Sequence, residues 1–419
     1  MTDAPADGIR FNGSGGSYTT LNNVASVGNT GSGSDGVEFQ TTTLVTDFEI
    51  LNSDLSGNAN TGLRFATFVQ VDGLKVENTH LDGNTIGFSV YSTNLSPTFN
   101  NIMFTDVSIS NNTSFGTYVE RMNNATFDGL TVMDNSSAVA NGYGFLAYLR
   151  AGSFDKVSFI NSTFTDNAGT SGCCTDLSFG GYESSMLTNL NVSHNLFSGS
   201  SNYAIYINSA YADAATSHVN RNSFGGTNAT GAVVIAGAPV SPFDTTCNWW
   251  KATDGPGPVG PGGGNKVSAN ADFTPWLYTS DLNGPCYVGG TIAIDKVAAG
   301  GGATEFEFDL SWSGTNVTLT DADAPYVTTP PLQAGNYAVT EINLPPGWSQ
   351  QSATCDNTTT TPVETVSPSF ITVADGDAWV CTFTNIYTPP PTNVCNVQDS
   401  SALWTDIIGA GMGNPKTHK

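Results

Sequence analysis

The sequence predicts an all-β protein in which a right-handed parallel β-helix precedes a small β-sandwich and a short tail. A glycine followed by spaced apolar residues recurs along the first two thirds of the 419-residue chain and returns at Gly231. The first six of these glycines lie 28, 26, 25, 29 and 28 residues apart, and they are Gly8, Gly36, Gly62, Gly87, Gly116 and Gly144. Such a repeat indicates a solenoid, because each coil buries its apolar face only by stacking on its neighbours.

Two apolar files and one polar file run in phase with the glycines. The first apolar file is Ile50, Val76, Phe104, Val132 and Phe159. The second is Leu55, Leu81, Ile109, Phe164, Phe197 and Phe224. The polar file is Asn52, Asn78, Asp106, Asp134 and Asn161. Asn and Asp tolerate the left-handed backbone of a tight corner, and stacked Asn side chains bond to those above and below. We therefore expect a parallel β-helix with short strands and Asn corners over residues 1–246.

Residues 247–285 have the composition of a cap and linker. The segment Cys247-Asn248-Trp249-Trp250 is followed by a loop rich in Gly and Pro and then by Pro275-Trp276-Leu277. Large aromatic side chains suit a cap, because the last coil would otherwise expose its apolar end to water. The segment resembles the closing segment of secreted bacterial β-helix repeat proteins. That resemblance implies an architecture and no chemistry.

Residues 286–388 alternate apolar and polar side chains over short runs, which is typical of a small β-sandwich. The clearest strands are residues 306–310, 337–341 and 379–383. Lys296 closes the first strand, Glu341 ends a middle strand and Asn385 ends the last strand. In this pattern the domain resembles the prealbumin-like B-type modules of bacterial surface adhesins and pilins. The resemblance implies that the Lys296 amine attacks the Asn385 side-chain amide, while Glu341 shuttles the proton, to form an intramolecular isopeptide bond.

The residue types of this trio support two interpretations. Burial lowers the pKa of a lysine and raises that of a glutamate, so a desolvated pair of Lys296 and Glu341 can be neutral at pH 7. A neutral amine held beside the amide of Asn385 is then a competent nucleophile, because proximity supplies most of the remaining activation. The alternative is an ordinary salt bridge between Lys296 and Glu341, with Asn385 as a turn residue at the end of its strand.

The seven cysteines suit an oxidising compartment. Cys355 and Cys381 are expected to pair inside the sandwich, which stabilises it by roughly 3 kcal/mol through loop closure. Cys247 and Cys286 bracket the cap and the start of the sandwich, so a bridge between them would fix the two domains relative to each other. Cys173 and Cys174 are adjacent and do not readily pair with each other. Cys395 is left over, as a free thiol or with an intermolecular partner.

Charge and targeting signals indicate where the protein works. The net charge of -24 disfavours nucleic acid and anionic membrane surfaces as partners. The chain has no run of 18 apolar residues and begins without a secretory signal, yet its cysteines favour an extracellular or cell-surface location. Candidate glycosylation sites in Asn-x-Ser/Thr triplets include Asn94, Asn124, Asn161, Asn191, Asn228 and Asn316.

No metal, cofactor or catalytic residue for an external substrate is expected. The histidines lack the spacing of metal ligands. Asp321 and Asp323 could hold Ca²⁺, although a solvated turn explains them as well. A polysaccharide-cleaving enzyme needs clustered acids with basic residues nearby, whereas the arginines of the coil lie on five different rungs. These are Arg10, Arg64, Arg121, Arg150 and Arg221.

We therefore expect a non-catalytic extracellular structural protein, a subunit of a cell-surface filament, fibre or adhesive stalk. Its main partner would be other copies of itself, joined through the β-helix end near residues 7–11 and through residues 394–408 of the tail. That tail follows the Pro389-Pro390-Pro391 spacer and completes the segment 389–419. The alternative is a surface adhesin or glycan-binding module that uses its corner loops. A polysaccharide-degrading enzyme is the least favoured class.

Overall fold

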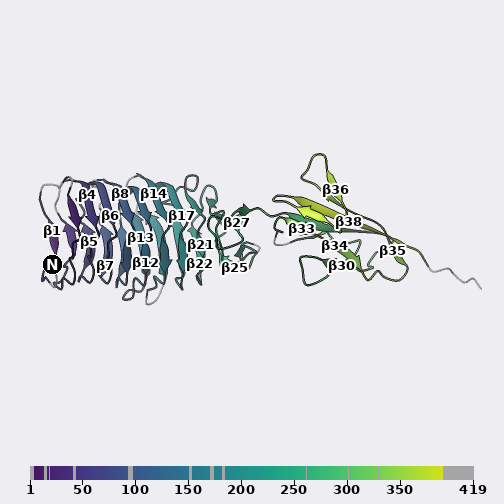
Figure 1. Ribbon diagram of the computed structural model, residues 1–419, viewed down its shortest axis with the longest axis horizontal. Helices are drawn as coiled ribbons and strands as arrows, with labels where there is room; N and C mark the ends of the chain where they lie inside the picture. The colour runs from purple at the N-terminus through teal and green to yellow at the C-terminus, as the bar shows by residue number, and fades with distance from the viewer. Residues whose placement is uncertain are drawn as a thin grey trace, which may run out of the picture. The chain divides into compact units, whose positions relative to one another are not determined.

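The computed structural model describes residues 4–13, 17, 19–40, 44–92, 98–150, 153–169, 174–181, 185–260, 262–300, 302–328 and 331–389. These residues form strands, turns and loops, and none of them is helical. They divide into two compact units, with the division between Gly289 and Gly290. The first unit is a stack of short parallel strands (Figure 1), which confirms the all-β, solenoid-like fold. In the described part of the chain, no helix reaches the length and hydropathy of a membrane span.

Three parallel sheets build the first unit. Within the described residues, one sheet has the order β1 (Ile9–Phe11), β3 (Val37–Phe39), β5 (Thr61–Phe65), β7 (Ile86–Val90), β10 (Phe115–Val119), β13 (Gly142–Leu149), β16 (Cys174–Gly181), β19 (Tyr203–Asn208) and β22 (Gly231–Ala236). We call it the glycine sheet, because its strands from β1 to β13 carry the predicted glycine repeat. On β22 the register places Ala232, and not the predicted Gly231, at the glycine position.

The other two sheets run alongside the glycine sheet. The longer one has the order β2 (Thr20–Asn22), β4 (Val45–Leu51), β6 (Val71–Glu77), β8 (Phe99–Thr105), β11 (Asn123–Asp128), β14 (Ser153–Ile160), β17 (Met186–Ser193), β20 (His218–Asn220), β23 (Phe243–Asp244) and β26 (Ala271–Asp272). The shorter one has the order β21 (Ser223–Phe224), β18 (Leu196–Ser198), β15 (Thr163–Thr165), β12 (Thr131–Met133) and β9 (Ser108–Ser110). The chain passes through the sheets in turn, so each circuit adds one rung.

The repeated glycine is required where neighbouring rungs approach most closely. A Cβ atom added to Gly62 would lie 2.8 Å from the carbonyl oxygen of Gly87 and 2.9 Å from the side-chain nitrogen of Asn84. Gly36 and Gly87 face the next rung in the same way. Real Cβ atoms do not approach a carbonyl oxygen so closely, so a larger residue would force the rungs apart.

A ladder of buried asparagines lies beside these glycines. Asn29 Nδ2 donates to Asn58 Oδ1 at 2.7 Å, and Asn58 Nδ2 donates to Asn84 Oδ1 at 3.0 Å. Asn112 Nδ2 donates to Asn135 Oδ1 at 2.9 Å. A buried amide is costly unless it is hydrogen-bonded, and the ladder provides such bonds between neighbouring rungs. Among the described residues, the Asn84 side-chain nitrogen is an exception, since only the Asn84 backbone nitrogen donates to Asn112 Oδ1. The buried ladder was not among the sequence predictions.

The predicted Asn corner exists, with one residue wrongly assigned to it. Asn52, Asn78, Asp106 and Asn161 all have left-handed backbones, with φ of 49°, 48°, 52° and 50°. Asn78 Nδ2 also donates to Asn52 Oδ1 at 2.8 Å, as stacked amides do. Asp134 follows β12 and therefore belongs to another corner, although its φ is also positive at 55°.

The first apolar file contains the same error. Phe127, and not Val132, pairs with Phe104 and with Phe159, whereas Val132 lies between Ile109 and Phe164 in the second file. The reason is a short rung, because the equivalent residues Asn112 and Asn135 are only 23 positions apart. A search for a step of about 28 residues overshoots at that point by five positions.

Aromatic side chains pack against the last rungs of the first unit. The Trp250 ring is fully buried and stacks on Phe224 with a centroid separation of 4.9 Å. Trp276 is 2% exposed, and its Nε1 donates to the Thr253 carbonyl oxygen. The short strands of this segment are β24 (Pro256–Gly257), β25 (Gly264–Lys266), β27 (Trp276–Leu277) and β28 (Cys286–Tyr287).

The second unit packs several small sheets around one core. The largest sheet has the order β32 (Tyr326–Val327), β29 (Thr291–Ala299), β38 (Ala378–Tyr387), β35 (Trp348–Asn357) and β36 (Glu364–Val366). The second has the order β31 (Val317–Leu319), β30 (Phe306–Leu310) and β34 (Val339–Ile342), and the third pairs β33 (Gly335–Tyr337) with β37 (Ile371–Val373). The single strand predicted over residues 337–341 is therefore broken at Ala338, where the chain changes sheets.

Asp176 occupies the glycine position of its rung and continues the buried polar ladder. Its carboxylate accepts hydrogen bonds from Asn167 Nδ2 at 2.8 Å and from Ser201 Oγ at 2.7 Å. The residue has no exposed surface, and burial raises the pKa of Asp176 to about 7. The folded state therefore holds a proton that the unfolded chain releases near pH 4, so this carboxyl destabilises the fold increasingly as the pH rises to about 7.

Replacing a glycine of the repeat should show whether close packing or backbone flexibility makes the glycine necessary. We expect Gly62→Ala to lower the free energy of unfolding by about 1–3 kcal/mol, because its Cβ meets backbone atoms of the next rung. Gly180→Ala on the same sheet is the matched control, since its Cβ meets only Tyr148 Cδ2 at 3.7 Å. Denaturant unfolding measures both. Equal effects of the two substitutions would contradict the close-approach explanation.

Asp176→Asn should change how stability depends on pH. The variant removes the titrating group, so we expect it to gain about 2–3 kcal/mol relative to the unsubstituted protein between pH 5 and pH 8. Thermal or denaturant unfolding at the two pH values measures the difference. Asp134→Asn, at an exposed position, serves as the control. The same pH dependence in both variants would show that the Asp176 carboxyl is not held protonated.

Candidate functional site

The predicted trio of Lys296, Glu341 and Asn385 meets between two sheets of the second unit. Lys296 lies on β29 and Asn385 on β38, and these strands are parallel neighbours in which Ala298 pairs with Asn385. Glu341 lies on β34 of the other sheet, where it pairs with Phe308. The three positions are not strand ends as expected, because β29 continues to Ala299 and β38 to Tyr387. Asn385 therefore lies inside a strand of the sandwich and not in a turn.

A single carboxylate oxygen joins the three side chains. Lys296 Nζ lies 3.1 Å from Glu341 Oε1. Asn385 Nδ2 donates to the same oxygen at 3.0 Å. The side chains of Lys296 and Glu341 are 1% and 0% exposed, and Asn385 has no exposed surface. The amine and the amide are therefore held next to each other, out of contact with solvent.

The Lys296 amine lies over an aromatic ring and beside two backbone carbonyl oxygens. Nζ lies 4.0 Å from the centroid of the Phe306 ring, and the rings of Phe308 and Phe383 pack edge to face nearby on β30 and β38. The other bonds of Nζ go to the carbonyl oxygens of Phe383 at 3.2 Å and Val297 at 3.4 Å. Burial lowers the pKa of Lys296 below its ordinary value, and the Glu341 carboxylate opposes that shift.

Two oxygen atoms of the trio are buried and have no hydrogen-bond partner among the described residues. They are Glu341 Oε2 and Asn385 Oδ1. An unsatisfied buried acceptor costs about 1–3 kcal/mol, so such groups call for a functional explanation. The side-chain carbonyl oxygen of Asn385 thus accepts no hydrogen bond from a described residue. The carbonyl carbon lies beside the Lys296 amine, whose charged form is disfavoured by burial.

The disulfide between Cys355 and Cys381 lies in the same unit. The two cysteines are directly paired across β35 and β38 and are fully buried. The bridge therefore ties the strand that carries Asn385 to its neighbour on the side away from β29. The candidate crosslink and the disulfide join β38 to different strands, so one does not replace the other.

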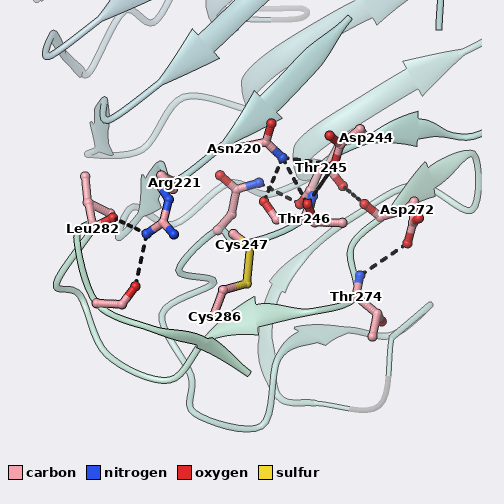
Figure 2. The surroundings of a disulfide bond; sticks show 12 residues. Asn220, Arg221, Asp244, Thr245, Thr246, Cys247, Asp272, Thr274, Leu282 and Cys286 are labelled. Carbon is pink, nitrogen blue, oxygen red and sulfur yellow. Dashed lines mark hydrogen bonds between the residues drawn. A yellow bond between two sulfur atoms is a disulfide. The ribbon is translucent and has the colours of Figure 1, made fainter. Parts of the chain in front are cut away.

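The second disulfide, between Cys247 and Cys286, holds the end of the first unit (Figure 2). Both cysteines precede the division at Gly289 and Gly290, so the bridge closes the solenoid and does not join the two units as expected. Cys247 has a φ of 56°. Nearby, Arg221 Nη1 donates to the carbonyl oxygens of Leu282 and Gly284, both at 3.0 Å (Figure 2), and anchors the same segment.

The candidate glycosylation sites differ in accessibility. Asn124, Asn161 and Asn316 are exposed, and Asn191 is half-buried. The Asn228 side chain is buried, and its Nδ2 donates to the Ser201 carbonyl oxygen at 2.8 Å. A glycan requires that nitrogen to face solvent, so Asn228 is unsuited to carry one in the folded protein. Asn94 lies outside the described residues, as do Cys173 and Cys395.

The candidate Ca²⁺ ligands act as turn acceptors. Asp321 Oδ1 accepts from the backbone nitrogen of Ala298 at 2.7 Å. Asp323 Oδ2 accepts from the backbone nitrogen and the hydroxyl of Thr320 at 2.7 and 2.9 Å. These bonds lower the pKa of Asp323. Both carboxylates therefore already stabilise the loop between β31 and β32.

A charged cluster near the start of the solenoid was not predicted from the sequence. Oxygens of Asp7, Asp35 and Glu38 lie within 4.8 Å of one another. Arg10 and Arg64 lie on separate rungs, as expected, and both form ion pairs with Glu38 on the rung between them. The repeat contained the signal, because Arg10, Glu38 and Arg64 occupy the same position after Gly8, Gly36 and Gly62. The arginines neutralise these partly or fully buried acids.

Comparison with known proteins identifies the second unit. Residues 292–387 match the family described as the prealbumin-like fold domain, which confirms the resemblance for that part of the chain. Domains of this type are structural modules of pilins and adhesins. The comparisons with curated proteins and with solved structures give no match. The chain thus combines a solenoid-like unit of parallel sheets with a prealbumin-like unit that contains the buried trio.

Proposed function

We propose that the protein is an extracellular structural subunit of a cell-surface filament, fibre or adhesive stalk, and that an isopeptide bond between Lys296 and Asn385 reinforces its second unit. The observation that carries the proposal is the shared contact of Lys296 Nζ and Asn385 Nδ2 with Glu341 Oε1 in a buried site. The match to a family of structural modules supports it.

The proposed reaction needs no group from outside the trio. Glu341 takes a proton from the Lys296 ammonium, and the neutral Nζ attacks the carbonyl carbon of Asn385. The Nζ–Cγ bond forms, and the protonated Glu341 returns a proton to Nδ2. The Cγ–Nδ2 bond then breaks and ammonia leaves. Glu341 takes the second proton from Nζ, so the products are a neutral amide and a protonated Glu341. The lowered pKa of Lys296 favours the first step, because burial disfavours the ammonium form.

A salt bridge alone is a weaker explanation of this site. A buried ion pair gains little net stability, because desolvation of both charges offsets their attraction. Here the pair also leaves Glu341 Oε2 and Asn385 Oδ1 without partners in the described structure. A site that is costly as an ion pair and holds a nucleophile beside an amide is better explained by the covalent product.

The position of the bond suits a protein under tension. Lys296 and Asn385 lie on the first and last long strands of the second unit, and these strands are parallel neighbours. A bond between them carries force past residues 297–384, which then bear none. Unfolding of the intervening strands would no longer lengthen the chain. This consequence is mechanical, and we propose no reaction on an external substrate.

Self-assembly is proposed through the end of the solenoid at β1 and β2. In the described residues, β1 and β2 are the terminal strands of their sheets, and Ile9 and Phe11 are only partly buried. Terminal strands of this kind invite pairing with another chain. The tail segment 394–408, which we propose as the partner, lies outside the described residues.

Exposed Asn124, Asn161 and Asn316 remain candidates for glycosylation in a host that glycosylates.

The crosslink predicts a loss of mass. We expect the intact chain, after reduction of its cysteines, to weigh about 17 Da less than its sequence, the mass of one ammonia. Asn385→Ala should have its full sequence mass, because no leaving group remains. Asn336→Ala, at an exposed position in the same unit, is the control and should keep the deficit. An intact chain without the deficit would favour the salt bridge.

The pH dependence of bond formation follows from the internal transfer of the Lys296 proton to Glu341. Burial lowers the pKa of Lys296, which favours this transfer. Because the pair exchanges one proton without solvent, the rate should change less than about tenfold between pH 7 and pH 9. Chains refolded from denaturant in this range, and followed by mass spectrometry, measure the rate. A rate that fell about tenfold for each unit of decrease in pH would show that the amine loses its proton to solvent, and it would contradict the role of Glu341.

Assembly is tested by electron microscopy of the purified full chain. We expect regular polymers, and we expect loss of polymers on removal of residues 394–408. Dispersed single particles from the full chain would contradict the assembly proposal while leaving the crosslink intact.

A further inference from the structure

An aromatic groove lies on the outer face of the glycine sheet, far from the proposed crosslink in sequence. Its volume is about 470 Å³, which is within the range of ligand-binding sites. Five tyrosines line it, and they are Tyr118, Tyr143, Tyr148, Tyr206 and Tyr211. All five are half-buried, so each presents part of its ring to solvent. We call this feature the tyrosine groove.

The register of three neighbouring strands creates the hollow. Outward-facing Leu146 on β13 pairs with Ser178 on β16, which pairs with Tyr206 on β19. Tyr148 likewise pairs with Gly180. The middle strand therefore carries small residues between larger ones on both sides. A Cβ atom on Gly180 would meet only Tyr148 Cδ2, at 3.7 Å, so the floor of the groove is open above this glycine.

The described residues that line the groove carry no charge. Besides the tyrosines, they are Leu146, Ser178, Gly180, Gly181 and Asn208. None of these side chains can pair with an ionic ligand, and the net charge of -24 disfavours polyanions. Exposed tyrosine rings offer apolar faces and polar hydroxyls, while Ser178 and Asn208 offer hydrogen bonds. This combination matches a ligand that is rich in hydroxyls and has flat apolar faces.

The sheet backbone at the groove is not available to a peptide. β13, β16 and β19 are interior strands, each paired on both sides. A peptide therefore cannot add to this surface as an extra strand, which is the common way that a sheet recognises an extended chain. Only side chains can contact the occupant. A sugar chain is recognised by side chains in this manner, through stacking and hydrogen bonds.

Contacts behind the rings hold several of them in place. The Tyr118 hydroxyl donates to Glu120 Oε1 at 2.8 Å, and the same oxygen accepts from Arg150 Nε at 2.9 Å. The Tyr203 and Tyr206 rings lie edge to face at a centroid distance of 5.7 Å. Rings that are fixed before binding lose little conformational entropy on contact with a ligand.

We infer that the tyrosine groove binds an uncharged polysaccharide, whose sugar rings stack on Tyr148 and Tyr206 across the small residues of β16. The site lies in the first unit and uses none of the residues of the proposed crosslink. It would give the structural subunit a second role, the attachment of the assembled protein to a neutral glycan surface.

Affinity electrophoresis of the full chain tests the inference. The probes are neutral glucan, mannan, xylan and galactan, with polygalacturonate as the anionic comparison. We expect at least one neutral polysaccharide to retard the protein and polygalacturonate to have no effect. The absence of retardation by every neutral probe, or equal retardation by polygalacturonate, would overturn the inference.

Two substitutions locate the binding. Tyr206→Ala removes a stacking ring, and Gly180→Leu fills the floor in a direction that the backbone tolerates. Each should weaken binding at least about tenfold, a change of roughly 1.4 kcal/mol. Phe68→Ala removes a ring that is 64% exposed outside the groove, and it should bind normally. Unchanged thermal unfolding shows that the variants fold. Binding by folded Tyr206→Ala and Gly180→Leu that equals that of Phe68→Ala would also overturn the inference.

Discussion

Close stacking of backbones is the constraint on which the first unit depends. From β1 to β13, each strand of the glycine sheet brings a glycine against a carbonyl oxygen of the next rung, and buried asparagines beside these glycines bond to one another. The apolar files, the left-handed corners and the tyrosine groove all follow from the register that this stacking imposes. Asp176 shows the limits of the constraint, because a carboxyl at the glycine position is accommodated only through two hydrogen bonds and a raised pKa.

The second unit depends on a different interaction, the buried contact of Lys296 and Asn385 with one oxygen of Glu341. Stacked rungs resist deformation because many weak contacts must break together. A small sandwich has fewer such contacts, and covalent bonds between its strands compensate for that. The disulfide of Cys355 with Cys381 and the proposed isopeptide bond would together connect β35, β38 and β29. We propose that stiffness is the property that the two units share.

Much of this architecture could be predicted from the sequence, because periodic spacing reports directly on stacked rungs. The glycine repeat identified the strands of one sheet correctly from Gly8 to Gly144. It failed at Val132 and Asp134, since spacing alone does not reveal a rung that is five residues short. The buried asparagines were hidden in a chain rich in Asn. Lys296, Glu341 and Asn385 came from a family resemblance, and periodicity carries no sign of them. The groove needed the register of β13, β16 and β19, because single tyrosines in a sequence do not show which residues lie between them.

The most direct test of the load-bearing role is to stretch single full-length molecules from their two ends under reducing conditions. The account predicts that unfolding of the second unit releases almost no length, because the bond between Lys296 and Asn385 bypasses residues 297–384. Asn385→Ala should release the whole segment, an added extension of roughly 300 Å. Release of that length by the unsubstituted protein would contradict the account.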